Sequence, residues 1–228
     1  MILLETKDLS LGYDGKEVLK GINLHVHDDD YLCIIGNNGS GKSTLIKGLL
    51  GLIPPLKGEI KLSPTLSRKE IGYLPQITTS QQNFPASVYE IVSSGILNTK
   101  KIFPLFTKEE KKRIQNAMQK LQIEHLKNKS YKELSGGQQQ KVLLARSLCA
   151  TQRILILDEP ITGLDEDSRN EVYQIVNRLH KEEHIAIIMI THNINEVASY
   201  ATRTMLVENQ CIINQKPETS LRGKLYDK

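Results

Sequence analysis

The stretch YLCIIGNNGSGKSTLIKGLL, residues 31–50, decides the fold of this chain. It begins with an apolar run typical of a buried strand and ends with the apolar pattern of a helix. Between them, GNNGSGKS at 36–43 matches the phosphate-loop pattern G-x-x-x-x-G-K-[S/T]. Its glycines let successive N–H groups face an anion, and the dipole of the following helix favours the same negative charge. The sequence therefore predicts a nucleoside triphosphate site at this turn.

The loop residues have separate predicted parts in holding ATP. Lys42 places a point charge on the β- and γ-phosphates, and the Ser43 hydroxyl is a predicted ligand of Mg²⁺. The alternative is a glycine-rich turn with a chance lysine, which the strand before it and the helix after it disfavour. The predicted ATP-binding residues of the loop are Gly36, Asn37, Asn38, Gly39, Ser40, Gly41, Lys42, Ser43 and Thr44.

A second apolar run, ILIL at 154–157, leads directly into Asp158 and Glu159. Ligands of open α/β sheets lie at the carboxyl ends of strands, so Asp158 is predicted to hold Mg²⁺, directly or through water. If the strand continued, Glu159 would point the opposite way, and it could act as general base for the attacking water. The alternative is a solvated turn before Pro160, which the accompanying phosphate loop disfavours.

Strand-like and helical patterns alternate along much of the chain. Continuous apolar runs such as AIIMI at 186–190 are separated by amphipathic helices, which predicts an α/β fold with a parallel sheet covered on both faces. From about residue 85 the pattern becomes helical, and Thr107 with Glu110 forms a capping-box signature. We expect this helical stretch to be a lobe inserted into the α/β core.

The segment LSGGQ, residues 134–138, places a serine N-cap and two glycines at the start of a helix. Such a helix start is an anion site in its own right. One ATP does not need two such sites from one chain, so this segment is predicted to cap the γ-phosphate held by a second subunit.

With these motifs in this order, the sequence resembles the nucleotide-binding subunits of ABC transporters over essentially its whole length. The resemblance implies a P-loop NTPase (RecA-like) parallel-sheet core, an N-terminal antiparallel β subdomain and an inserted α-helical lobe. It implies one domain, 1–228, with core and β subdomain at 1–78 and 151–228 and the lobe at 79–150. It also implies a head-to-tail homodimer with ATP. The residues that would then act in trans are Ser135, Gly136, Gly137 and Gln138.

Four further positions take roles from the same resemblance. Tyr13 matches the aromatic residue that stacks on adenine, its alternative being a core-facing strand tyrosine. Gln76, in GYLPQ, matches the glutamine that senses Mg²⁺ and the attacking water, its alternative being a loop glutamine. Asp165 matches an aspartate that contacts the opposite subunit, and it can also be a helix N-cap. His192 matches the histidine that contacts the γ-phosphate. The predicted catalytic residues are Lys42, Gln76, Glu159 and His192.

Two features stand outside this scheme. Lys141 occupies a position where the family often has arginine, so the charge is kept and the planar fork is lost. HVHDDD at 25–30 resembles a metal-binding cluster, but we interpret it as an exposed strand end and turn. In the family, a Gly-Glu turn is commoner than Asp28-Asp29-Asp30.

Composition narrows the partners that the chain can have. The net charge is only +4 and the charges are interleaved, which disfavours a nucleic-acid partner. No apolar run approaches the roughly 20 residues needed to cross a bilayer, and the start does not resemble a signal peptide. Together with these observations, the resemblance to ABC transporter subunits implies a peripheral protein on the cytoplasmic face of the cell membrane. The partners that the resemblance implies are a second copy, a separate integral membrane permease and, indirectly, an extracytoplasmic substrate-binding protein.

The predicted function is Mg²⁺-dependent ATP hydrolysis that drives an importer of divalent metal ions, zinc or manganese. IGYLPQ, followed by FPASVYEIVSSG at 84–95, is similar to the corresponding stretch of zinc/manganese importers, and the chain length fits that group. Siderophore and cobalamin importers share a similar YLPQ stretch and remain an alternative. A soluble ABC ATPase, for example in cofactor assembly, is another. A nucleotide kinase would leave LSGGQ unexplained.

Overall fold

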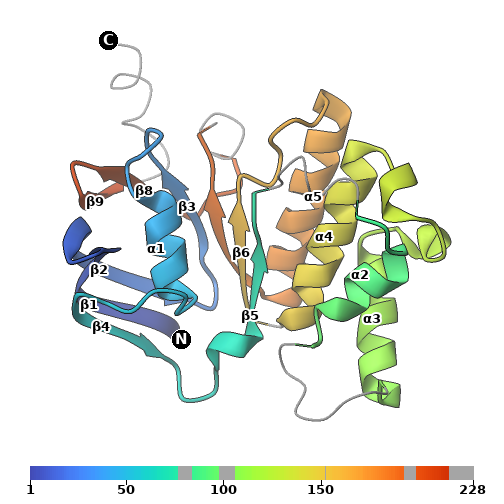
Figure 1. The fold of residues 1–228 in the computed structure, drawn as a ribbon, viewed down its shortest axis with the longest axis horizontal. Coiled ribbons are helices and arrows are strands. Elements are labelled where there is room, and N and C mark those ends of the chain that lie inside the picture. Colours follow the sequence, from blue (N-terminus) through green and yellow to red (C-terminus); the bar gives the residue numbers. More distant parts are fainter. Residues whose placement is uncertain (77–83, 98–105, 152, 193–198, 216–228) are drawn as a thin grey trace. The chain divides into compact units, whose positions relative to one another are not determined.

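The computed structural model describes residues 1–76, 84–97, 106–151, 153–192 and 199–215 (Figure 1). The chain divides into two compact units. Unit 1 comprises Met1–Arg68 and Ala186–Lys228, and unit 2 comprises Lys69–Ile185. The predicted boundaries between core and lobe fall elsewhere, at 78/79 and 150/151, and they stay a prediction.

Unit 1 contains a three-stranded antiparallel sheet in the order β2-β1-β4. Its strands are β1 (Ile2–Tyr13), β2 (Lys16–His27) and β4 (Lys57–Leu62). Asp14 and Gly15 both have positive φ, 50° and 74°, which suits the two-residue hairpin that joins β1 to β2. The antiparallel β subdomain is thus confirmed, and its first two strands are 12 residues each.

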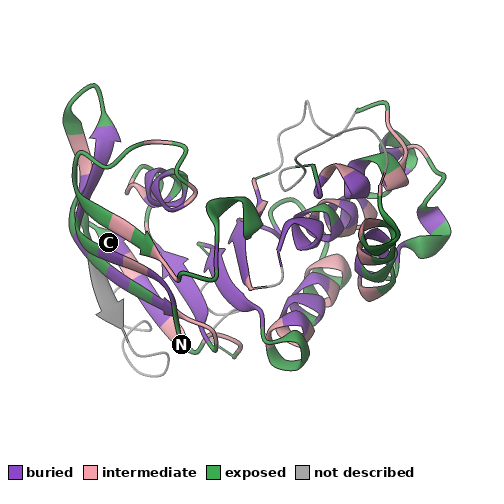
Figure 2. Cartoon of the chain, turned by 90° about the horizontal axis from the view of Figure 1, so that it is seen from below, coloured by how far each residue is buried: buried purple, intermediate pink, exposed green. Residues whose placement is uncertain are grey.

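Unit 1 also contains parallel strands around β3 (Tyr31–Ile35). β3 pairs in parallel with β7 (Ala186–Ile190) and with β8 (Arg203–Glu208), and β9 (Cys211–Gln215) pairs antiparallel with β8. Every residue of β3 and β7 is buried, and Figure 2 draws buried residues in purple. Their continuous apolar sequences therefore reflect burial on both faces, as predicted. β8 and β9 were not expected, because polar residues interrupt their apolar pattern.

In its described residues, unit 2 combines a parallel strand pair with four α-helices. β5 (Ile71–Leu74) pairs in parallel with β6 (Ile154–Asp158). The helix α4 contacts α2, α3, α5 and β5, and it is the centre of this unit's helical packing (Figure 1). The helices are α2 (Val88–Ser94), α3 (Lys108–Lys120), α4 (Gly136–Ala150) and α5 (Glu166–Glu183), with short 3-10 turns at Glu124–Leu126 and Tyr131–Glu133. A further 3-10 turn, Arg68–Glu70, begins at the last residue of Met1–Arg68.

Local sequence signals explain where the helices of unit 2 begin. Thr107 Oγ1 accepts from the Glu110 N–H at 3.1 Å, and Glu110 Oε2 accepts from the Thr107 N–H at 2.7 Å, so the predicted capping box is confirmed. Ser87 and Glu90 form the same reciprocal pair at the start of α2. One apolar face of α3 and its C-cap is buried; its members are Ile114, Ala117, Met118 and Leu121.

Candidate nucleotide site

The predicted phosphate loop connects β3 to α1 (Lys42–Leu49) in unit 1, as the sequence pattern requires. Gly41 is the N-cap of α1 with φ of 107°, and Gly39 has φ of 79°. Side chains other than glycine rarely adopt these values, so the glycines allow the tight turn. The helix that follows is anchored by apolar residues that are fully buried, namely Leu45, Ile46 and Leu49.

The polar groups of this loop fit an anionic ligand with many oxygen atoms. The Lys42 ammonium group is buried and donates to the carbonyl oxygens of Gly36 and Asn37 at 2.8 and 2.9 Å. Ser40 Oγ is buried and has no hydrogen-bond partner among the described residues. A buried hydroxyl normally has a partner, and a phosphate oxygen is a partner that this loop is built to receive. Ser43 is the second residue of α1 and is exposed.

The carboxylate pair lies at the end of β6 in unit 2, where the condition attached to the predicted direction of Glu159, a continuing strand, is not met. Asp158 is the last residue of β6 and is 8% exposed. The strand does not continue through Glu159, whose φ of 48° turns the chain out of the extended conformation. Alternation along a strand therefore does not orient the Glu159 side chain. Its orientation comes instead from hydrogen bonds.

Glu159 is held by two donors within unit 2. Gln76 Nε2 donates to Glu159 Oε2 at 3.1 Å, and Thr162 Oγ1 donates to the same oxygen at 3.0 Å. Two predicted site residues 83 positions apart are thus in direct contact. Thr162 had no predicted role. The signal that could have indicated it is its place three residues after Glu159, where a turn brings side chains together.

Asp158 has a neighbour that sequence reasoning also missed. The Tyr73 hydroxyl donates to Asp158 Oδ2 at 3.5 Å. Tyr73 pairs with Ile156 across β5 and β6, and Ile156 shares a sheet face with Asp158 because side chains alternate. Burial, reinforced by the Asp158 carboxylate, raises the pKa of Tyr73 to about 12. Tyr73 is therefore a neutral hydrogen-bond donor at physiological pH.

The LSGGQ segment forms the start of α4. Ser135 is its N-cap, and Ser135 Oγ accepts from the Gln138 N–H at 3.3 Å. Gln138 Oε1 accepts from the Ser135 N–H at 3.2 Å, which completes a capping box. Ser135 and Gly136 are exposed. The predicted N-cap is confirmed, and the role in a second subunit's site stays a prediction.

Asp165 is the N-cap of α5. Its carboxylate accepts from the Ser168 N–H at 2.9 Å and from the Ser168 hydroxyl at 2.8 Å. The hydrogen bond from the Ser168 N–H lowers the pKa of Asp165 most, and the hydrogen bond from the Ser168 hydroxyl lowers it further. The capping role is confirmed; the contact with the opposite subunit stays a prediction.

The two remaining site residues are exposed in unit 1. Tyr13, at the end of β1, is 43% exposed, so the alternative of a core-facing tyrosine was wrong. Lys47 Nζ lies 5.6 Å from the centre of its ring. His192 is exposed two residues after the end of β7. Both are accessible to a ligand, and their roles stay predictions.

Two other sequence features lie outside this candidate site. Side chains of the HVHDDD cluster contact other residues of unit 1: His25 Nε2 lies 3.0 Å from Glu5 Oε1, and Arg203 Nη1 donates to Asp30 Oδ2 at 2.9 Å. No group of three or more histidine, cysteine or acidic residues in the described part of the chain could hold a metal ion. Lys141, the departure from the family's arginine, forms an ion pair with Glu171 between α4 and α5.

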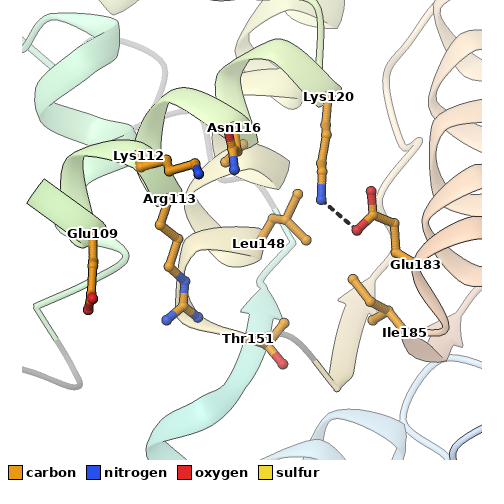
Figure 3. A pocket seen from close by; sticks show the side chains of 10 residues that line it. Glu109, Lys112, Arg113, Asn116, Lys120, Leu148, Thr151, Glu183 and Ile185 are labelled. Carbon is orange, nitrogen blue, oxygen red and sulfur yellow. Dashed lines mark ion pairs between the residues drawn. The ribbon is translucent and has the colours of Figure 1, made fainter.

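Two pockets of unit 2 contain none of the predicted site residues. One, of about 460 Å³, lies along α3 and the ends of α4 and α5, and the Lys120–Glu183 ion pair of 2.6 Å lines it (Figure 3). Its lining mixes acidic, basic and apolar side chains. The other, of about 330 Å³, has a mainly apolar lining. It is formed by Pro75, Phe84, Ala86, Glu90, Ile91, Ser94, Tyr131, Leu143 and Arg146.

The α/β fold and the loop between β3 and α1 define a P-loop nucleotide-binding protein. The sequence profile of the ABC transporter family matches residues 19–162. The chain therefore belongs to the ABC transporter family, and the family's ATP-binding domain implies that it binds and hydrolyses ATP.

Relatives and solved structures agree with this assignment. The chain is 34% identical to the high-affinity zinc uptake system ATP-binding protein ZnuC of Bacillus subtilis, over 91% of this chain and 92% of the relative. It is 36% identical to the zinc transport system ATP-binding protein AdcC of Streptococcus pneumoniae, over 92% of each chain. The structure of cbiO1 from Clostridium perfringens, part of the ABC transporter complex cbiONQ, is 34% identical with a TM-score of 0.82, over 95% of this chain and 89% of that one.

Proposed function

We propose that this chain is the Mg²⁺-dependent ATPase subunit of an importer of divalent transition metal ions, zinc or manganese. For the ATPase, the observation that carries the proposal is the Glu159 carboxylate, held by Gln76 at 3.1 Å and directly following Asp158. For the cargo, support comes from the similarity to ATP-binding proteins named for zinc uptake and zinc transport, over more than nine-tenths of this chain.

In this proposal the chain's own residues bind ATP and move one proton. The loop from Gly36 to Thr44 holds the phosphates, and Tyr13 stacks on the adenine. Glu159 accepts a proton from water as the water oxygen bonds to the γ-phosphorus. The bond between that phosphorus and the β–γ bridging oxygen breaks, giving ADP and inorganic phosphate. His192 contacts the γ-phosphate during this step.

The donor atoms proposed for Mg²⁺ fit the ion, because it prefers hard oxygen ligands. Ser43 offers a hydroxyl, Asp158 a carboxylate and Gln76 an amide oxygen, since its nitrogen is the atom that donates to Glu159. When bound, the ion supplies positive charge that offsets the charge of the phosphate oxygens.

We infer that the working form contains two copies of the chain in a head-to-tail dimer with ATP. The helix start at Ser135 and Gly136 is exposed, and its N–H groups suit a phosphate held by the facing copy. Gly137, Gln138 and Asp165 belong to the same proposed interface.

The proposed partner in the membrane is a separate permease, and the proposed location is the cytoplasmic face of the membrane. In the described residues no helix has the length and apolar character needed to span a bilayer. The apolar pocket beside α2 is the proposed contact with the permease, and Phe84 at its edge is 58% exposed. We propose that the lobe segment 77–106, which overlaps this pocket, takes part in the contact; its residues 77–83 and 98–105 lie outside the described residues.

Deletion of the gene, followed by metal-uptake measurements under chelation, tests the cargo. We expect the deletion strain to lose uptake of radiolabelled zinc or manganese, the parent gene to restore it, and Glu159→Gln not to restore it. Normal zinc and manganese uptake together with defective ferric-chelate uptake would overturn the proposed cargo but not the proposed ATPase activity. Normal uptake of all of these would point to a soluble ABC ATPase.

A further inference from the structure

The turn after β6 contains a polar residue that the proposed mechanism does not use, Thr162. Its hydroxyl donates to Glu159 Oε2 at 3.0 Å, and its backbone N–H donates to the Glu159 carbonyl oxygen at 3.3 Å. Thr162 therefore contacts both the side chain and the main chain of Glu159.

This double contact matters because Glu159 has an unusual backbone conformation. Its φ of 48° lies in the left-handed region, which non-glycine residues adopt rarely and only where the surroundings stabilise it. The Thr162 N–H closes a four-residue turn, Glu159 to Thr162, so Glu159 with its unusual backbone is the first residue of that turn. The Thr162 hydroxyl also donates to the Glu159 carboxylate, and this hydrogen bond holds the Glu159 side chain in place.

The second donor to the same oxygen comes from a different segment. Gln76 lies just after β5, and its amide nitrogen donates to Glu159 Oε2 at 3.1 Å. In the proposed function the Gln76 side chain also serves the magnesium ion and the attacking water, so this hydrogen bond competes with other tasks. The proposed function gives Thr162 no second task, and Thr162 belongs to the same turn as Glu159.

We propose that Thr162 is a positioning residue for the general base, and that its hydroxyl orients the Glu159 carboxylate toward the attacking water. This inference rests on the proposed function, in which Glu159 is that base. A hydrogen bond to an ionised group is about twice as strong as one between neutral groups, so its loss should misdirect the carboxylate measurably. The side chain of Thr162 is exposed, so the hydroxyl, and not apolar packing, is the part that matters.

The test compares Thr162→Val, which keeps the shape and removes the hydroxyl, with Thr162→Ser, which keeps the hydroxyl. Both are made in the full-length chain, and ATP turnover is measured with MgATP. We expect Thr162→Val to lower kcat about tenfold while KM for ATP stays within about twofold, and Thr162→Ser to stay within about twofold of the parent. An unchanged thermal unfolding midpoint confirms that each variant is folded, and Thr162→Ala replaces the valine variant if that one is not.

A double variant shows whether Thr162 acts through Glu159. In Glu159→Gln, adding Thr162→Val should not lower the residual turnover further, because the carboxylate that Thr162 orients is already gone. A further tenfold loss there, or equal losses in Thr162→Val and Thr162→Ser, would overturn the inference. Parental turnover in Thr162→Val would also overturn the inference about Thr162. If Glu159→Gln were inactive in the same experiment, the proposed ATPase function would still stand. Parental turnover in Glu159→Gln would instead overturn the proposed function itself.

Discussion

At the scale of single residues, Glu159 combines a strained backbone with a fixed side chain. It follows a buried strand that ends in Asp158, and its carboxylate accepts from Gln76 and Thr162. Such a conformation at a site residue is expected where geometry matters more than local stability. Exchanging the carboxylate for an amide changes its chemistry and very little of its shape.

Glu159→Gln should therefore separate ATP binding from hydrolysis. General-base catalysis typically contributes about 10²- to 10⁴-fold, so we expect kcat to fall at least about 100-fold. ATP affinity should stay within about twofold of the parent, because the phosphate loop is unchanged. Without hydrolysis, the ATP-bound dimer should accumulate, and size-exclusion chromatography with MgATP should detect it. Turnover close to that of the parent would exclude Glu159 as the base.

Sequence reasoning found the residues of known motifs but not their neighbours. Lys42 and Asp158 could be predicted because each chemical role has a fixed place next to a strand or a helix. Tyr73 and Thr162 could not, because the register of two strands and the closing of one turn bring them to the site. The positive φ of Glu159 was also missed, since the apolar run does not show where the strand ends.

At the scale of elements, helix starts were the most predictable feature, because they depend on residues three positions apart. The capping box of α3 was found from Thr107 and Glu110. The same signature, Ser87 with Glu90, begins α2 but was not used as a marker. β8 was missed for a different reason: Arg203 and Thr204 interrupt the apolar alternation, and pairing with β3 decides that it is a strand.

The α3 capping box gives a stability prediction that should leave catalysis untouched. Thr107→Ala removes the acceptor of the Glu110 N–H, and we expect the loss of about 1 kcal/mol in the free energy of unfolding. Thr107→Ser keeps the acceptor and is the matched control, with a change of no more than a few tenths of a kcal/mol. Urea denaturation measures both, and ATP turnover per folded molecule should equal that of the parent. Equal losses in both variants would show that the cap is not the stabilising feature.

The start of α4 gives a prediction about the second subunit. Ser135→Arg places a bulky cation at an exposed helix start, so we expect nucleotide binding by the single chain to stay within about twofold while the ATP-bound dimer fails to form. Binding is measured with a fluorescent ATP analogue, and the dimer is measured in the Glu159→Gln background. Ser67→Arg, at an exposed serine of the other unit, is the control and should dimerise normally. A Ser135→Arg chain that dimerises like the control would exclude the role in trans.

At the scale of the whole molecule, the proposed function couples ATP hydrolysis to a separate permease. The apolar pocket beside α2 is suited to such a contact because it places exposed apolar surface next to the elements that lead to Gln76 and to α4. Pro75, which immediately precedes Gln76, lines this pocket, and so does Arg146 of α4. Arg146 Nε donates to Ser94 Oγ at 3.0 Å, which ties α4 to α2. A side chain inserted here would therefore contact both segments.

Phe84→Asp should break the contact with the permease and leave the isolated ATPase intact. Phe84 is 58% exposed at the pocket's edge, so a carboxylate there costs little in the free chain but would be buried without a partner in the complex. We expect the variant to hydrolyse ATP at the parental rate in solution, to be lost from the membrane fraction, and to fail to restore metal uptake in the deletion strain. Leu52→Asp is the matched control, because Leu52 is 66% exposed in unit 1 and does not line the pocket. The control should bind membranes and restore uptake; if Phe84→Asp did the same, the permease would have to bind elsewhere.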